Sequence, residues 1–211
     1  MKTLARMQRG LETLYRVETG VEVGHFVCSA EFRDELCRTA PTPPSRKARE
    51  QLLVVEQDGE MNLALFIEPA VIARLDGHGH DLQDMLLAVE GVSHFIYTVW
   101  CARHERPLSQ LELELQAEVD KYVTCLLQMD ADPGASAELR WRLFESSVYE
   151  DDLDEEEQHR YRAANDNAAR YASYLEDAFV ARRRIPEMLA ELRRFYRQSL
   201  AAKLSTIARA A

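Results

Sequence analysis

The sequence predicts a mostly helical α+β fold, with a small antiparallel β-hairpin or sheet near the N-terminus packed on a helical bundle. Two apolar runs flank Asp58-Gly59 within residues 51–67, which is typical of a hairpin. Two longer segments, residues 82–104 and 107–129, carry apolar residues at helical spacing. With 211 residues, 46% of them apolar, the chain is large enough to bury a core.

The N-terminal region predicts a helix, then a strand, then a loop. Apolar residues from Leu4 to Tyr15 recur at helical spacing, and Thr19-Gly20 supplies a stop signal. Alternating apolar residues from Val21 to Val27 predict a short strand. Residues 39–45 include three prolines, which remove backbone donors, so this segment is expected to form a loop.

The pattern also predicts the register of the hairpin. A two-residue type I′ turn at Asp58-Gly59 places Val54 opposite Leu63 and Leu52 opposite Leu65. Both faces of this hairpin carry apolar side chains. We therefore expect other parts of the protein to cover each face.

The segments at 82–104 and 107–129 predict an antiparallel helical hairpin. Asp81 can cap the first helix, and the short connection at 103–106 brings the second helix back alongside it. The first helix is apolar on nearly all sides but carries Glu90, Ser93 and His94. We expect it to be a buried core helix and not a membrane span.

The remainder of the chain predicts further helices. The acidic run 151–157 favours a helix N-terminus, Ile185-Pro186 interrupts the helical pattern, and a last helix is expected from Met188 to Ile207. We divide the chain into an α+β core at 1–150 and a helical C-terminal extension at 151–211, packed on the core.

Charge and composition predict a cytoplasmic protein. Lys2, Arg6 and Arg9 interrupt the N-terminal apolar residues, which argues against a secretory signal, and four widely spaced cysteines indicate reduced thiols. The net charge is −10, but residues 158–211 hold eleven basic and five acidic side chains. The charge is therefore about −16 before residue 158 and +6 after it.

One group of polar residues predicts a divalent metal site between the two helices of the helical hairpin. Glu90 and His94 stand four residues apart on the first helix, and Glu114 and Glu118 stand four apart on the second. Carboxylates and imidazoles projecting inward from paired helices form metal sites in bundle proteins. In the alternative interpretation, Glu114, Glu118 and Lys121 form an ordinary ion-paired surface.

Two other groups resemble parts of metal sites. The loop Gly77-His78-Gly79-His80-Asp81 has two imidazoles at chelating spacing, and His25, Cys28 and Cys37 are three zinc-type ligands without a fourth nearby. The sequence contains no nucleophile elbow, P-loop or dinucleotide-binding glycine motif. Recognisable hydrolase, NTPase and dinucleotide-binding signatures are thus missing.

Six arginines of the C-terminal helices form a candidate anion-binding group: Arg182, Arg183, Arg184, Arg193, Arg194 and Arg197. Arginines near tyrosines can contact phosphates and stack on bases, but the acidic net charge disfavours nucleic acid as a partner. Alternatively, the basic end neutralises the acidic stretch 145–157 or the surface of another copy.

The leading functional expectation is a binding or regulatory protein with an unidentified ligand, and with a protein partner or self-association. The first alternative is a metal-dependent enzyme using Glu90, His94 and Glu118, in which the metal polarises a substrate or activates water. The second is a nucleic-acid binder using the C-terminal arginines. No membrane partner is expected.

Overall fold

The computed structural model describes residues 1–39, 48–57, 59–77, 79, 81–145 and 154–210. The elements are α1 (Lys2–Tyr15), α2 (Ala30–Thr39), β1 (Glu50–Gln57), β2 (Glu60–Ile67), α3 (Pro69–Asp76), α4 (Leu82–Arg103), α5 (Gln110–Gln128), α6 (Pro133–Arg140), α7 (Glu155–Leu175), α8 (Ile185–Tyr196) and α9 (Leu200–Ala210). Two π-helical turns follow α6 and α7, at Trp141–Glu145 and Glu176–Val180. The expected α+β, mostly helical fold is confirmed. The loop expected at 39–45 lies almost entirely outside the described residues.

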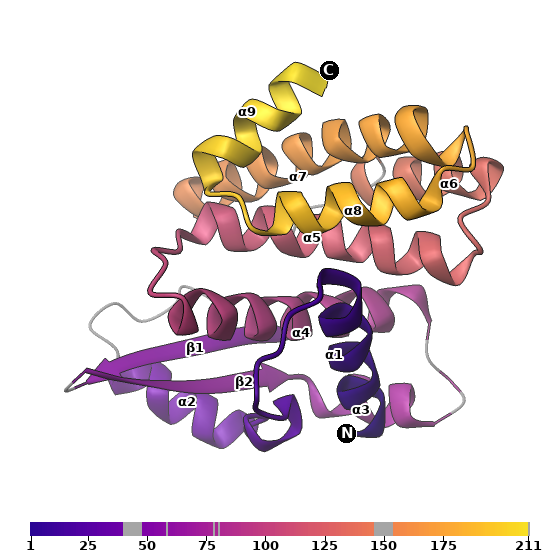
Figure 1. Ribbon diagram of the computed structural model, residues 1–211. Helices are drawn as coiled ribbons and strands as arrows, with labels where there is room; N and C mark the ends of the chain where they lie inside the picture. The colour runs from indigo at the N-terminus through magenta and orange to yellow at the C-terminus, as the bar shows by residue number, and fades with distance from the viewer. Residues whose placement is uncertain (40–47, 58, 78, 80, 146–153, 211) are drawn as a thin grey trace.

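The elements stack in layers around α4. The hairpin packs on one side of α4 and α5 on the other, while α7 lies beyond α5 and α9 packs on α7 (Figure 1). Helix α1 packs against both α4 and α8. Residues on both sides of position 150, such as Leu115 and Tyr171, belong to one hydrophobic core. The boundary predicted at residue 150 falls outside the described residues and stays a prediction.

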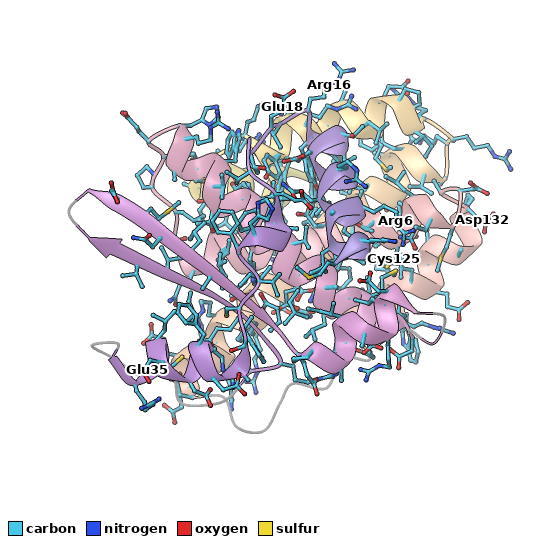
Figure 2. All side chains as sticks on the ribbon, turned by 90° about the horizontal axis from the view of Figure 1, so that it is seen from below. Arg6, Arg16, Glu18, Glu35, Cys125 and Asp132 are labelled. Atoms are coloured by element: carbon cyan, nitrogen blue, oxygen red, sulfur yellow. The ribbon has the colours of Figure 1, made fainter. Side chains whose placement is uncertain are left out.

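The predicted hairpin register is confirmed. Strands β1 and β2 are antiparallel, with Val54 opposite Leu63 and Leu52 opposite Leu65. Gly59 adopts a φ of 81°, which favours glycine, while Asp58 is outside the described residues. The expectation that both faces are covered is wrong toward the turn, where Val54 is 46% and Val55 42% exposed. Figure 2 shows why, because this end of the hairpin extends beyond the helices.

The strand predicted from Val21 to Val27 is wrong. Residues Val23–His25 form a 3₁₀ turn, and the backbone of the segment pairs with the sheet at one parallel bridge, between Val27 and Leu65. The backbone N–H of Val23 donates instead to Oε1 of Gln8 on α1, at 2.8 Å. A side chain thus satisfies the donor that a strand partner would otherwise take. Helices α2 and α3 were not predicted.

The predicted helical hairpin is confirmed by α4 and α5. Asp81 caps α4 by accepting from the N–H of Asp84 at 2.9 Å, and Ser109 caps α5 by accepting from Glu112 at 3.2 Å. Helix α4 is long and apolar enough to cross a membrane by length and composition, but 78% of its most apolar window is buried inside the fold. This burial is typical of the core helix of a soluble protein.

The C-terminal prediction is partly wrong. Helix α7 starts with a capping box between Asp154 and Glu157, as the acidic run indicates. The single last helix expected from Met188 to Ile207 instead breaks into α8 and α9. The break turns the face of α9 that carries Lys203 and Ile207 into the core, where both residues are at most 1% exposed.

Candidate metal site between the hairpin and two helices

The structure brings together the polar residues that the sequence places on the two central helices. His94 of α4 lies with its Nε2 3.5 Å from Oε2 of Glu114 on α5. Lys121 of α5 donates to Glu90 of α4 at 3.1 Å and to Glu118 at 2.6 Å. The expectation that Glu90 and His94 are less exposed than typical charged residues is confirmed, since their side chains are 20% and 6% exposed.

Glu50 completes this group, and the sequence analysis missed it. It is the first residue of β1, and the hairpin register places it opposite Ile67. Its Oε1 lies 3.5 Å from Nδ1 of His94, so the imidazole is flanked by two carboxylates. We call Glu50, Glu90, His94, Glu114, Glu118 and Lys121 the carboxylate–histidine cluster.

Gly91 makes room for Glu50 against α4. A Cβ atom at this position would lie 3.0 Å from both Cγ and Oε1 of Glu50, and 3.2 Å from Cδ1 of Ile67. A glycine inside a helix costs about 1 kcal/mol relative to alanine. The close approach of the Glu50 carboxylate supplies a reason for the glycine in α4.

The ion pairs divide the cluster into two parts. His94 lies between Glu50 and Glu114, and Lys121 lies between Glu90 and Glu118. Burial alone would lower the pKa of His94, but the charges of Glu50 and Glu114 outweigh it, and that pKa lies well above its usual range. Burial raises the pKa of Glu50 despite the opposing effect of His94. Burial likewise raises the pKa of Glu118, although Lys121 opposes it. Burial alone would lower the pKa of Lys121, but Glu118 and Glu90 raise it.

The cluster has unsatisfied polar atoms and excess negative charge. Four carboxylates face two cations, which leaves two negative charges when His94 is protonated. Oε1 of Glu50 and Nε2 of His94 are buried and have no hydrogen-bond partner within the described chain. Buried polar groups without partners are costly, and such atoms call for an ion or another ligand.

The geometry of these atoms suits one metal ion. One ligand atom each from Glu50, Glu90 and His94 can be chosen so that all lie within 4.8 Å of one another. Metal–ligand bonds of roughly 2.0–2.2 Å place ligand atoms roughly 3–3.5 Å apart, so atoms near the 4.8 Å limit would have to approach by up to roughly 1.5 Å. Within the residues that the structure covers, this is the one group of three such side chains close enough to share an ion.

A second polar cluster lies on the other side of α5, around Lys203. The Lys203 side chain is fully buried and donates to Oη of Tyr97 at 2.8 Å and to Oε1 of Gln116 at 2.7 Å. Tyr97 donates in turn to Glu112 at 2.7 Å. Gln116 donates to Asp120 at 2.8 Å, and this carboxylate also accepts from Ser93 and from Tyr15 of α1. These groups form the buried lysine cluster.

Burial dominates the titration of this second cluster. It lowers the pKa of Lys203 to about 7, against the opposing charge of Glu112. It raises the pKa of Asp120 to about 6, against hydrogen bonds from Ser93 and Tyr15. Since Lys203 is 0% exposed, the cluster ties α9 to the core and offers no surface to a substrate.

The sequence contains signals for these missed residues. Glu112, Gln116 and Asp120 recur every four residues on α5, which is the spacing of one polar helix face. Lys203 stands at helical spacing from Leu200 and Ile207, on the apolar face of its helix. An ionisable residue in an apolar stripe indicates a buried partner.

The six C-terminal arginines do not form one group. Arg184 and Arg194 pair with Glu187 and Glu191 on their own helix, at 3.2 and 2.5 Å. Arg193 donates to the carbonyl of Leu14 at 2.8 Å, and Arg197 to those of Tyr15 and Arg16 at 3.0 Å. Arg182 lines a small surface pocket beside Asp177, and Arg183 is exposed. Most of the acidic stretch expected to neutralise them lies outside the described residues.

The remaining metal candidates receive no support from the described chain. His78 and His80 are outside the described residues, and Asp81 serves as the helix cap. His25, Cys28 and Cys37 do not bring ligand atoms close enough to share an ion, among the residues searched. No family model, no curated protein and no solved structure matches this chain.

Proposed function

We propose that the protein is a binding protein whose ligand, at the carboxylate–histidine cluster, is a divalent metal ion. The observation that carries this proposal is the pair of unsatisfied buried atoms, Oε1 of Glu50 and Nε2 of His94. A metal ion held by Glu50 and one imidazole nitrogen of His94 would satisfy Oε1 of Glu50 and neutralise the excess negative charge, and the other nitrogen would keep its proton for a neighbouring carboxylate. Glu50, Glu90 and His94 are the proposed ligands, and Glu114 lies on the other side of the imidazole.

The mixed donor set favours a first-row transition metal, Zn²⁺ or Mn²⁺. Imidazole nitrogen together with carboxylate oxygen suits these ions. Calcium and magnesium prefer oxygen ligands alone, and magnesium in addition keeps several waters. We therefore expect Zn²⁺ or Mn²⁺ to bind more tightly than Ca²⁺ or Mg²⁺.

The location of the site favours a structural or regulatory ion over a catalytic one. Catalytic metals keep an open coordination position for substrate or water, whereas the side chains of Glu50 and His94 are only 7% and 6% exposed. The ligands come from β1 and α4, so an ion would join the hairpin to the helical body. This role accords with a binding or regulatory protein and places the metal-dependent enzyme second.

Metal content and affinity test the proposal. The protein is purified without a metal-affinity tag, analysed for bound elements, stripped, and titrated with Zn²⁺ and Mn²⁺ by calorimetry. We expect one ion per chain at this site, bound at least tenfold more weakly after Glu50→Gln or His94→Gln, since each change removes one ligand.

Exposed His104 provides the matched control. Its ring lies outside the cluster, against Trp100, so His104→Gln removes one imidazole without touching the proposed site. This variant should bind like the parent protein. Stoichiometric binding with unchanged affinity in both Glu50→Gln and His94→Gln would disprove the assignment, and so would binding that is lost only in His104→Gln.

A further inference from the structure

An arginine-lined cleft lies at the C-terminal end of α1. It has a volume of about 1320 Å³ and opens between α1, the turn after α4, and α8. Arg9 lines it from α1 and Arg16 from the residue that follows α1, while Arg193 and Arg197 line it from α8 and the residue that follows α8. Figure 2 shows Arg16 and Glu18 at this end of α1, with Arg6 toward the opposite end. The cleft is separate from the carboxylate–histidine cluster, with which it shares no lining residue.

Two of these arginines are held in place by the backbone. Arg193 and Arg197 donate to the carbonyls of Leu14, Tyr15 and Arg16, at 2.8 to 3.0 Å. These are the carbonyls that the end of α1 leaves without a helical partner. Their guanidinium groups are thus positioned at the cleft before any ligand arrives, which limits the entropy lost on binding.

The other two arginines have no partner in the described chain. The side chains of Arg9 and Arg16 make no hydrogen bond or ion pair with any described residue, and both are exposed. Arg9 lies on α1, Arg16 is the left-handed residue that ends this helix, and both line the cleft. Their guanidinium groups are consequently free to contact a ligand.

The cleft is locally positive in a protein of net charge −10. Five arginines line it against three glutamates; of these, Arg106 pairs with Glu112 outside the lining, and Glu12 accepts a hydrogen bond from Thr19 at 2.6 Å. Desolvation lowers the pKa of Arg193, and the neighbouring charges of Arg16 and Arg197 lower it further. The effect of these two cations on the pKa of Arg193 indicates positive charge without enough counterions at the cleft.

We propose that this cleft binds a small, multiply charged oxyanion, either a phosphoryl compound or a polycarboxylate. The planar guanidinium group presents paired donors that match the oxygens of phosphate and carboxylate. A volume of about 1320 Å³ accommodates a small metabolite. The cleft is local and carries Glu18 and Glu105 in its lining, which disfavours an extended polyanion such as nucleic acid.

Calorimetric titration at low salt with pyrophosphate and with citrate tests this site. Pyrophosphate represents phosphoryl ligands and citrate represents polycarboxylates, so the tighter probe identifies the class. The double variant Arg9→Gln/Arg16→Gln should bind at least tenfold more weakly. These two exposed side chains make no hydrogen bond or ion pair with other described residues, so the variant should keep its fold, which circular dichroism and thermal unfolding will show.

The same helix provides a charge-matched control. Lys2→Gln/Arg6→Gln removes two exposed positive charges from α1 but none from the lining of the cleft, and its affinity should equal that of the parent. Because both probes chelate metals, the titrations use metal-free protein, and the binding should persist in His94→Gln.

Three results would overturn the proposal. The first is that neither probe binds at low salt. The second is that the Arg9→Gln/Arg16→Gln variant and the Lys2→Gln/Arg6→Gln control bind equally well. The third is that a short single-stranded oligonucleotide binds more tightly than either probe through Arg9 and Arg16, which would assign the cleft to nucleic acid instead.

Discussion

Lys203 donates a hydrogen bond of 2.8 Å to the hydroxyl of Tyr97, which lies 106 positions earlier in the chain. This contact joins α9, near the C-terminus, to α4 at the centre of the fold (Figure 1). Among the lysines and arginines of the described core, Lys203 is the one that is completely buried, at 0% exposed. Its titration should therefore be visible in the stability of the protein.

Lys203→Met should remove a pH dependence of stability. Burial lowers the pKa of Lys203 from 10.5 to about 7 in the folded state, so between these values the unfolded chain binds more protons. Stability then rises with pH over this window, by up to about 1.4 kcal/mol per pH unit. Urea unfolding at pH 7, 8 and 9 should show a steeper rise for the parent than for the variant. The exposed Lys2→Met serves as control, and parallel pH profiles for all three proteins would refute the prediction.

Gly91→Ala should weaken metal binding without unfolding the protein. The added Cβ would lie 3.0 Å from Cγ and Oε1 of Glu50, and it would push this carboxylate away from His94. We expect at least a tenfold loss of Zn²⁺ or Mn²⁺ affinity, measured by competition with a chelator.

Gly10→Ala is the control, since its Cβ would meet nothing within 4 Å. It should leave the affinity unchanged and stabilise the protein by about 0.5–1 kcal/mol. Equal affinities of the two variants would contradict the role of Glu50.

The affinity for a divalent ion should rise with pH. Although burial opposes it, the charges of Glu50 and Glu114 hold the pKa of His94 above its usual range, so the metal-free protein carries an imidazolium at neutral pH. A metal must displace this proton, which costs about tenfold in affinity per pH unit below that pKa. The stabilisation by the imidazolium is fully present below pH 6.5 and is lost as pH rises through the folded pKa. Calorimetry at pH 6, 7 and 8, in two buffers of different ionisation enthalpy, measures both affinity and proton release. Affinity that does not change with pH would argue against His94 as a ligand.

Lys121→Met should destabilise the metal-free protein and strengthen metal binding. Lys121 is 12% exposed and pairs with Glu90 and Glu118, so its loss removes a positive charge from beside two partly buried carboxylates. We expect a loss of about 3 kcal/mol in the free energy of unfolding, partly restored by Zn²⁺. Without the competing positive charge of Lys121, the cluster should also bind the metal more tightly.

A double variant separates the two effects. Lys121→Met/Glu118→Gln removes both members of the 2.6 Å ion pair and should be less destabilised than Lys121→Met alone. Unfolding in urea, with and without Zn²⁺, provides the comparison. A single variant that is as stable as the parent would show that Lys121 does not neutralise the cluster.

The local elements were predictable because they depend on near neighbours in the chain. Helices α4 and α5 carry their own caps, and the hairpin register follows from two matched apolar runs and a turn signal. The alternation from Val21 to Val27 predicted a strand wrongly, because the side chain of Gln8 on α1 accepts the hydrogen bond from the backbone N–H of Val23. Such a contact across the fold leaves no trace in local periodicity.

The sequence by itself determined the α+β class, the helical hairpin, and the presence of Glu90, His94, Glu114 and Glu118 on its two helices. Only the tertiary structure decided that Glu50 lies beside His94, because the docking of the hairpin over Gly91 brings the strand to the helix. The tertiary structure also decided that Lys203 is buried while Arg183 is exposed. Helical periodicity describes the faces of one helix, whereas burial and charge pairing depend on which other element covers each face.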